Sequence, residues 1–297
     1  MRARVLGSAA GGGLPQWNCA CPICALARAG DPRVRRRTQD SIAVSSGGEG
    51  WHVFNASPDI RAQIEASSCL HPRSPRDTPI RSLVLTNGDL DHVLGLFSLR
   101  ESTPLVVWAT DAVRAGLEER NALVRTLHRF PEQLTWKRLE LGQEQPLENG
   151  LTIEARTLPG KGPVHLAGLV PHGPEDNVAL WVRHRGRTLV YASACGSLQG
   201  LEAAFDDADV LLFDGTFFSS DELVARGLSR ARAEDMAHLP VGGERGSIAG
   251  LARSRARRKI YTHVNNSNPL LVDGSPEHRS ALGAGWEVAF DGMEIEA

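Results

Sequence analysis

The chain has 297 residues, of which 41% are hydrophobic and 23% charged, so it has the composition of a globular protein with a substantial core. A net charge of −2 gives no electrostatic case for nucleic acid or a membrane surface as a partner. No apolar run approaches the ~20 residues that a transmembrane helix requires, and the N-terminus lacks the apolar core of a signal peptide. We therefore expect a cytoplasmic protein.

Apolar runs between turns rich in glycine and proline predict that much of the chain forms strands. A glycine-rich turn between two of them, at 41–45 and 51–55, favours a hairpin. The predicted strands lie at 3–7, 41–45, 51–55, 82–85, 104–108, 134–141, 151–158, 164–170, 177–183, 188–193, 209–213, 260–264 and 286–290.

Three helices are predicted among these strands. Ser57 and Pro58 open one that runs to Glu65, the apolar residues 93–99 form a second, and Thr110 caps a third that runs past Arg120. Strand clusters occur in both halves of the chain, so the sequence predicts two β-rich layers covered by helices. We expect one α/β domain over residues 1–297.

Cys19, Cys21 and Cys24 form a C-x-C-x-x-C cluster. A short turn can direct three thiols at one ion, and zinc binds thiolates in closed tetrahedral structural sites. We favour a structural zinc site at residues 19–24, with a fourth ligand from elsewhere in the chain. Reactive thiols or plain buried cysteines are the alternatives.

Candidate metal ligands recur where predicted strands end. They are Asn87, Asp89, Asp91 and His92 after one strand, Asp214 and His263 at two other strands, and His238 in a turn. Strand ends along one sheet edge are close in space, so these side chains can meet. Oxygen and imidazole ligands suit iron, manganese or zinc, and two histidines with one carboxylate suit non-haem Fe(II) in particular. The alternatives are caps of helices and turns for the carboxylates and satisfied core groups for the histidines.

These motifs together resemble the coenzyme PQQ synthesis protein B family of the metallo-β-lactamase superfamily. The matching motifs are T-N-x-D-L-D-H at 86–92, C-x-C-x-x-C at 19–24, L-F-D-G-T at 212–216, H-L-P at 238–240 and T-H-V-N-N-S-N-P at 262–269. The superfamily signature T-H-x-H-x-D-H has Asn87 and Asp89 here in place of its first two histidines.

The resemblance implies an αββα sandwich with a metal at one edge of its paired sheets. It also implies a role in making pyrroloquinoline quinone (PQQ), as an iron- and O₂-dependent hydroxylase of the tyrosine ring in a cross-linked Glu–Tyr precursor. That precursor and O₂ are then the expected partners. A carrier that binds and transports PQQ, or a metal-dependent hydrolase of the same fold, is the alternative function.

By the same resemblance, Asp91, His92 and His263 would bind the Fe(II). Asp89 would be a further ligand or would orient an imidazole, and Asp214 and His238 would stand beside the metal, with His238 as the acid–base group because imidazoles titrate near neutrality.

Related phosphodiesterases place a histidine where this chain has Asn266, so Asn266 is the candidate fourth ligand of the cysteine cluster. The residues that bind the substrate carboxylates and the oligomeric state, a monomer or an oligomer, stay open.

Overall fold

Two mixed β-sheets of seven strands each form the centre of the computed structural model, which describes residues 1–47, 49–169 and 171–297. The first sheet has the order β14 (Glu294–Glu296), β1 (Arg2–Gly7), β2 (Ser41–Ser45), β3 (Trp51–Phe54), β4 (Ile80–Val84), β5 (Leu105–Ala109) and β6 (Leu134–Arg138). The second has the order β13 (Trp286–Val288), β12 (Arg258–Thr262), β11 (Val210–Asp214), β10 (Arg187–Ala192), β9 (Val178–His184), β8 (Thr152–Thr157) and β7 (Glu144–Pro146).

Each sheet is antiparallel on one side and parallel on the other. Strands β3 to β6 are parallel in the first sheet, and β10 to β13 are parallel in the second. Helical connections join most of these parallel strands, as a crossover between parallel strands requires. The carboxyl ends of the parallel strands therefore gather several connecting turns at the sheet edges.

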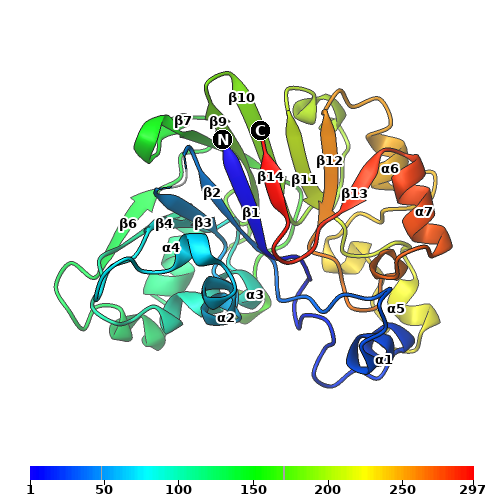
Figure 1. The fold of residues 1–297 in the computed structure, drawn as a ribbon, viewed down its shortest axis with the longest axis horizontal. Coiled ribbons are helices and arrows are strands. Elements are labelled where there is room, and N and C mark those ends of the chain that lie inside the picture. The colour runs from blue at the N-terminus through cyan, green and yellow to red at the C-terminus, as the bar shows by residue number, and fades with distance from the viewer. Residues whose placement is uncertain (48, 170) are drawn as a thin grey trace.

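Helices cover the two outer faces of the paired sheets (Figure 1). The α-helices are α1 (Pro22–Ala29), α2 (Ile60–Glu65), α3 (Leu90–Val93), α4 (Asp111–Glu118), α5 (Glu222–Ala225), α6 (Ser247–Gly250) and α7 (Pro276–Gly283). The 3₁₀ helices are η1 (Ser68–Leu70), η2 (Leu94–Ser98), η3 (Ala122–Thr126), η4 (Glu148–Gly150), η5 (Val164–Leu166), η6 (Glu202–Phe205), η7 (Glu234–Met236) and η8 (Pro269–Leu271).

Three apolar layers explain why the sheets stack. The middle layer joins residues of both sheets, such as Ile42 and Val84 with Leu180 and Leu212, all of them fully buried. A second layer packs α2 and α4 on the first sheet, and a third packs α1 and α7 on the second, where Tyr261 stacks on Trp286 with ring centroids 4.0 Å apart. This arrangement confirms the predicted αββα sandwich.

The two chain ends close the first sheet at its antiparallel side. Strand β14 pairs with β1, and the Met1 nitrogen donates a hydrogen bond to the Ala297 carbonyl at 2.9 Å. Both termini lie side by side at the top of Figure 1. Among the described residues, no helix has both the length and the apolar character needed to cross a membrane.

Most predicted elements are confirmed, and several differ. The helix predicted at 93–99 is the 3₁₀ helix η2, and the last predicted strand ends at Val288 instead of residue 290. The strand predicted at 164–170 is wrong: residues 164–166 form η5, and Gly168 at φ +75° breaks any extended backbone, while residue 170 lies outside the described residues. The third predicted helix, α4, is capped by Thr110 as expected but ends at Glu118. Strand β6 ends at Arg138, short of the predicted 141. Ser57 accepts a hydrogen bond from the Asp59 nitrogen in a turn, and helix α2 begins only at Ile60.

Candidate metal centre

The predicted ligands of the strand ends meet at one edge of the sandwich. Residues 87–92 follow β4 as a turn and helix α3, Asp214 is the last residue of β11, and His263 follows β12 directly. Strands β11 and β12 are parallel, with Asp214 in register with Thr262, so their ends lie at the same level. His238 reaches this edge from the turn after η7.

Asp91, His92 and His263 place one potential ligand atom each within 4.8 Å of the others. The Nε2 of His263 is 3.2 Å from Oδ2 of Asp91, and the Nε2 of His92 is 3.9 Å from the same oxygen. The two imidazole rings meet edge to face, with centroids 5.1 Å apart. Two imidazoles and one carboxylate converging in this way form the facial donor set that Fe(II) and zinc both accept.

The buried Nε2 of His92 is the observation that best fits a metal here. His92 is 1% exposed, and this nitrogen has no hydrogen-bond partner among the described residues. Leaving a buried polar atom unpaired costs about 1–3 kcal/mol. A cation held between His92, Asp91 and His263 would remove that cost, so the residues present fit a metal ion.

Hydrogen bonds to the other ring nitrogens orient both imidazoles. Nδ1 of His92 lies 2.9 Å from Oδ1 of Asn87, and Nδ1 of His263 lies 2.8 Å from Oγ1 of Thr216. The amide oxygen of Asn87 can only accept, so it fixes the His92 tautomer with the proton on Nδ1 and the lone pair on Nε2. Asn87, which replaces a ligand histidine of the superfamily signature, thus orients the imidazole of His92.

Asp214 and His238 lie beside this triad, where they were predicted. Nδ1 of His238 is 2.7 Å from Oδ2 of Asp214, and the His238 ring stacks on the His263 ring with centroids 5.4 Å apart. The fully buried Asp214 also accepts hydrogen bonds from the backbone nitrogens of Cys195 and Thr216. These bonds hold the carboxylate in place, so it can position the imidazole of His238.

Asp214, His238 and His263 form a second group of potential ligand atoms within 4.8 Å of one another. The two groups share His263, whose Nδ1 is occupied by Thr216. One free nitrogen can ligate one ion, so His263 cannot serve both groups at once. Asp89 lines the same pocket but belongs to neither group in the described part of the chain.

The electrostatics of the triad favour a cation. Burial lowers the pKa of His92 to about 4, which keeps that imidazole neutral near pH 7. Burial also opposes ionisation of Asp91, but His92 and His263 outweigh it and hold the pKa of the Asp91 carboxyl well below its usual range. Burial disfavours charge on His263 too, yet the hydrogen bond and charge of Asp91 raise its pKa to about 9. A metal ion would take the place of that proton.

A pocket of about 450 Å³ opens in front of these groups. Its volume is within the range of small-molecule sites. Apart from Asn87, Asp89, Asp91, His92, His238 and His263, its lining includes Ala10, Gly11, Leu90, Lys161, Val164, His165, Ala194, Thr216, Phe217, Met236 and Asn265. Lys161 lies between two predicted strands, and His165 lies within the strand predicted at 164–170. Neither position gave a clear indication of a functional role.

A buried polar network between the sheets connects the two halves of the site. The hydroxyls of Tyr191 and Thr262 both donate to the fully buried carboxylate of Asp40. Asn55 donates to the Tyr191 oxygen at 3.2 Å and accepts from the Thr86 nitrogen at 3.0 Å. Thr86 and Thr262 directly precede the 87–92 turn and His263, so the network fixes the spacing of both.

The loop that carries His263 is strained and well supported. His263 has a φ of +55°, which a non-glycine residue rarely adopts and which is characteristic of functional sites. Asn268 donates to the carbonyls of Gly215 and Thr216, and Ser267 donates to Oε1 of the buried Glu222 at 2.5 Å. Glu222 therefore holds the loop through Ser267. Burial raises the pKa of the Glu222 carboxyl to about 7.

Glu222→Gln should flatten the pH dependence of stability. Below pH 4.5 the carboxyl is protonated in both states, and up to about pH 7 the folded state binds more protons than the unfolded chain. The free energy of unfolding of the native protein should therefore fall as pH rises through this window, by about 1–3 kcal/mol from this group. Urea unfolding at pH 5 and pH 8 with saturating zinc measures the fall in both proteins. An equal fall in both would contradict the assignment.

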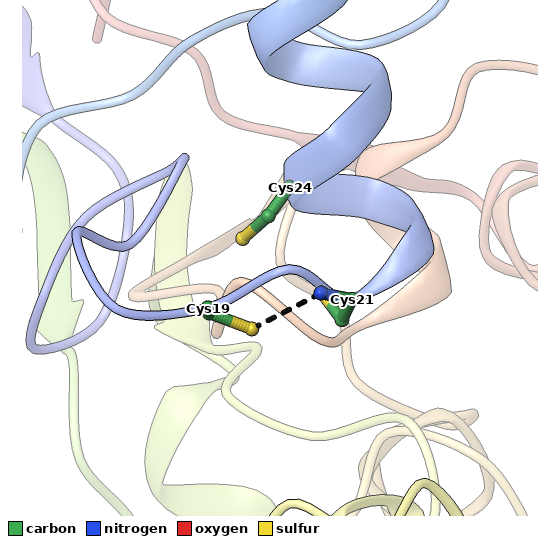
Figure 2. A group of neighbouring side chains, drawn as sticks. All are labelled: Cys19, Cys21 and Cys24. Carbon is green, nitrogen blue, oxygen red and sulfur yellow. Dashed lines mark hydrogen bonds between the residues drawn. The ribbon is translucent and has the colours of Figure 1, made fainter.

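The cysteine cluster lies apart from the pocket, at the start of α1. Figure 2 shows Cys24 on the helix and Cys19 in the loop before it, with their sulfur atoms turned toward the same space. The three sulfurs lie within 4.8 Å of one another, and the Cys21 nitrogen donates to Sγ of Cys19 at 3.4 Å. Such convergence of thiols fits a zinc ion.

The side chain of Asn266, the candidate fourth ligand, lies against the three sulfurs of this cluster. Its Nδ2 lies 3.3 Å from the sulfurs of Cys19 and Cys24 and 3.7 Å from that of Cys21. The nitrogen faces the sulfurs in this structure, and a half-turn of the amide brings Oδ1, the atom that can ligate, to the same place. The cluster thus joins α1 to the loop that carries His263.

Cys24→Ala should remove one bound zinc ion and destabilise the protein. The lost ion would lower the free energy of unfolding in zinc-containing buffer by about 2–4 kcal/mol, the linkage expected of a ligand present far above its dissociation constant. Metal analysis and urea unfolding measure both effects. Cys69→Ala is the control, because this half-buried thiol belongs to no group of potential ligands among the described residues. Unchanged zinc content in Cys24→Ala would contradict the site.

Comparison with known proteins identifies the family. A model of the β-lactamase superfamily domain matches residues 50–264. The chain is 41% identical to coenzyme PQQ synthesis protein B of Methylorubrum extorquens, over the full length of both chains, and 44% identical to that of Methylobacterium nodulans, over 99% of both. The crystal structure of zinc-bound PqqB from Methylobacterium extorquens matches all of both chains with a TM-score of 0.95 at 41% identity. The chain therefore belongs to the coenzyme PQQ synthesis protein B family, within the β-lactamase superfamily.

Proposed function

We propose that this protein acts in PQQ biosynthesis as an Fe(II)- and O₂-dependent hydroxylase of the tyrosine ring in a cross-linked Glu–Tyr precursor. Its family supports the pathway. The donor set of Asp91, His92 and His263, with the unpaired Nε2 of His92, supports the reaction class. These residues would hold Fe(II) with coordination positions left open, and the metal would supply the reductive activation of O₂.

The single observation that carries the proposal is that His263 can serve only one metal. A dinuclear hydrolase of this fold needs a hydroxide between two ions, and here Asn87 and Asp89 stand in place of two histidines. Asn87 uses its amide oxygen to orient His92, so this residue does not replace the missing histidine as a ligand of a second ion. The hydrolase alternative is therefore disfavoured by the ligand set.

The chain's own residues would position the substrate and move its protons. Asp214, whose pKa His238 and His263 hold below its usual range despite burial, accepts from Nδ1–H of His238. Nε2 of His238 is then the free acceptor at the pocket wall, where it can take the phenol proton of a tyrosine ring. Phe217, Leu90 and Val164 supply apolar surface for that ring.

The test is anaerobic loading with Fe(II), addition of the Glu–Tyr precursor and a two-electron reductant, and admission of O₂, because each oxygen atom inserted into the ring leaves the other to be reduced to water. We expect oxygen uptake and a product heavier by whole oxygen atoms in mass spectrometry. A zinc-loaded sample of the same protein is the control and should give neither. Turnover with zinc alone and no oxygen uptake would contradict the proposal, and tight PQQ binding without turnover of the precursor would favour the carrier alternative.

A further inference from the structure

We propose that Lys161 forms a carboxylate-binding subsite in the pocket and holds one carboxylate of the substrate. The inference rests on the proposed function, because it names the group by which that same pocket recognises its ligand. It supplies what the metal triad lacks, a positively charged side chain in the same pocket.

Lys161 is the one lysine or arginine that lines the pocket in the described part of the chain. Its ammonium makes no hydrogen bond or ion pair with any described residue. An unpaired cation that faces a small-molecule pocket is free to bind an anion there.

The loop around Lys161 is held at several points, which gives its backbone a defined place, while the Lys161 side chain is exposed. The Gly196 nitrogen donates to the Pro159 carbonyl at 2.7 Å, and the Gly162 nitrogen donates to Nδ1 of His172 at 3.1 Å. Gly160 and Gly162 have no room for side chains: an added Cβ would lie 2.7 Å from Nδ2 of Asn177 and 2.5 Å from the His172 ring, respectively. The backbone on both sides of Lys161 therefore packs closely on its neighbours.

The loop also contacts the turn that carries the metal ligands. A Cβ added at Gly88 would lie 3.0 Å from Cγ of Pro163, so the Pro163 ring packs directly against the backbone of Gly88. Lys161 is two residues from this contact, and Asp91 and His92 are three and four residues from it on the other side. The packing therefore places the backbone near Lys161 against the turn that carries Asp91 and His92.

The charges around Lys161 select the class of anion. Asp89 and Asp91 line the same pocket, so a doubly charged phosphoryl group would be repelled by two carboxylates. A carboxylate carries one charge and pairs well with a single ammonium. His165, which also lines the pocket, can donate a further hydrogen bond to the same group. The ligand class is thus a small aromatic acid with a carboxylate remote from its reacting ring.

PQQ and its trimethyl ester form the matched pair of probes for this subsite. The acid carries the carboxylates and the ester lacks their charge, while the ring system is the same. Binding to the zinc-loaded protein is measured by titration calorimetry, which requires neither O₂ nor turnover. In Lys161→Met the affinity for PQQ should fall about tenfold or more, as expected for one lost charge-assisted hydrogen bond, and the affinity for the ester should not change.

Two further variants complete the design. Lys161→Arg keeps the charge and should retain most of the affinity for PQQ. Lys137→Met is the matched control, because this exposed lysine on β6 lies over the Trp108 ring, away from the pocket, and its loss should leave binding unchanged.

Three outcomes would overturn the subsite: unchanged PQQ affinity in Lys161→Met, an equal loss of affinity for acid and ester, or loss of the bound metal, which would mean that Lys161 acts through Asp89. The binding result is independent of hydroxylation. If the precursor is not hydroxylated but Lys161→Met still weakens the binding of PQQ and not that of the ester, only the proposed reaction fails. If hydroxylation occurs and the variant binds PQQ normally, only the subsite fails.

Discussion

His92→Ala should release the metal of the Asp91–His92–His263 triad and lower kcat/KM for the hydroxylation by about 10³-fold or more. The variant lacks the Nε2 that is buried and unpaired in the metal-free geometry. The metal supplies several kcal/mol of stabilisation in metal-dependent catalysis, and each 1.36 kcal/mol is worth a factor of ten in rate. Metal analysis of the purified variant should find the ion of the cysteine cluster retained and the second ion missing.

His52→Ala is the matched control for this prediction. His52 is 2% exposed on β3, and its Nε2 also lacks a hydrogen-bond partner among the described residues, but it belongs to no group of potential ligands there. Loss of this imidazole should destabilise the protein through a cavity without changing its metal content. Full metal content in His92→Ala, or equal metal loss in both variants, would show that the triad is not the binding site.

The αββα layers could be predicted from the sequence because long apolar runs such as 209–213 and 188–193 are buried on both faces. Short elements gave no such signal. Strands β7 and β14 have three residues each, and their charged residues match a turn as well as an edge strand. The error at 164–170 has the same origin, since Val164, which lines the pocket, and Leu169 are apolar but 74% and 56% exposed. Composition does not distinguish an apolar rim from a buried strand.

The candidate ligands could be predicted because their residue types and their places at strand ends are visible in the sequence. Their orienting partners could not, because the bond of Thr216 to His263 spans 47 positions and becomes apparent only when β11 and β12 align. Asn87 looked like a lost ligand, and its bond to His92 gives it a function within the turn. Lys161 gave no signal at all, since a single lysine in a connection has no pattern.

The buried network adds a reason why these strand ends hold a defined geometry. Asp40 would be costly in the middle of the sandwich without partners, and burial raises its pKa to about 6. The hydroxyls of Tyr191 on β10 and Thr262 on β12 donate hydrogen bonds to this carboxylate. Thr262, which donates to Asp40, precedes His263, and Thr86, which donates to Asn55, precedes the metal turn. The buried polar groups therefore set the distance between the two halves of the site.

His238→Gln should lower kcat about 10²–10⁴-fold, the range for a lost acid–base group, while the triad keeps its metal and KM changes little. Asp214→Asn should give a smaller loss in kcat, because the carboxylate acts through the imidazole that it positions at 2.7 Å. The double variant should then be no slower than His238→Gln alone, since the two residues act as one unit. Single-turnover rates of the native protein, the two single variants and the double variant, all loaded with Fe(II), measure these effects. Metal analysis shows whether each variant keeps its ion. Losses that add would separate the two roles, and metal loss in His238→Gln would assign the ion to the group of Asp214, His238 and His263.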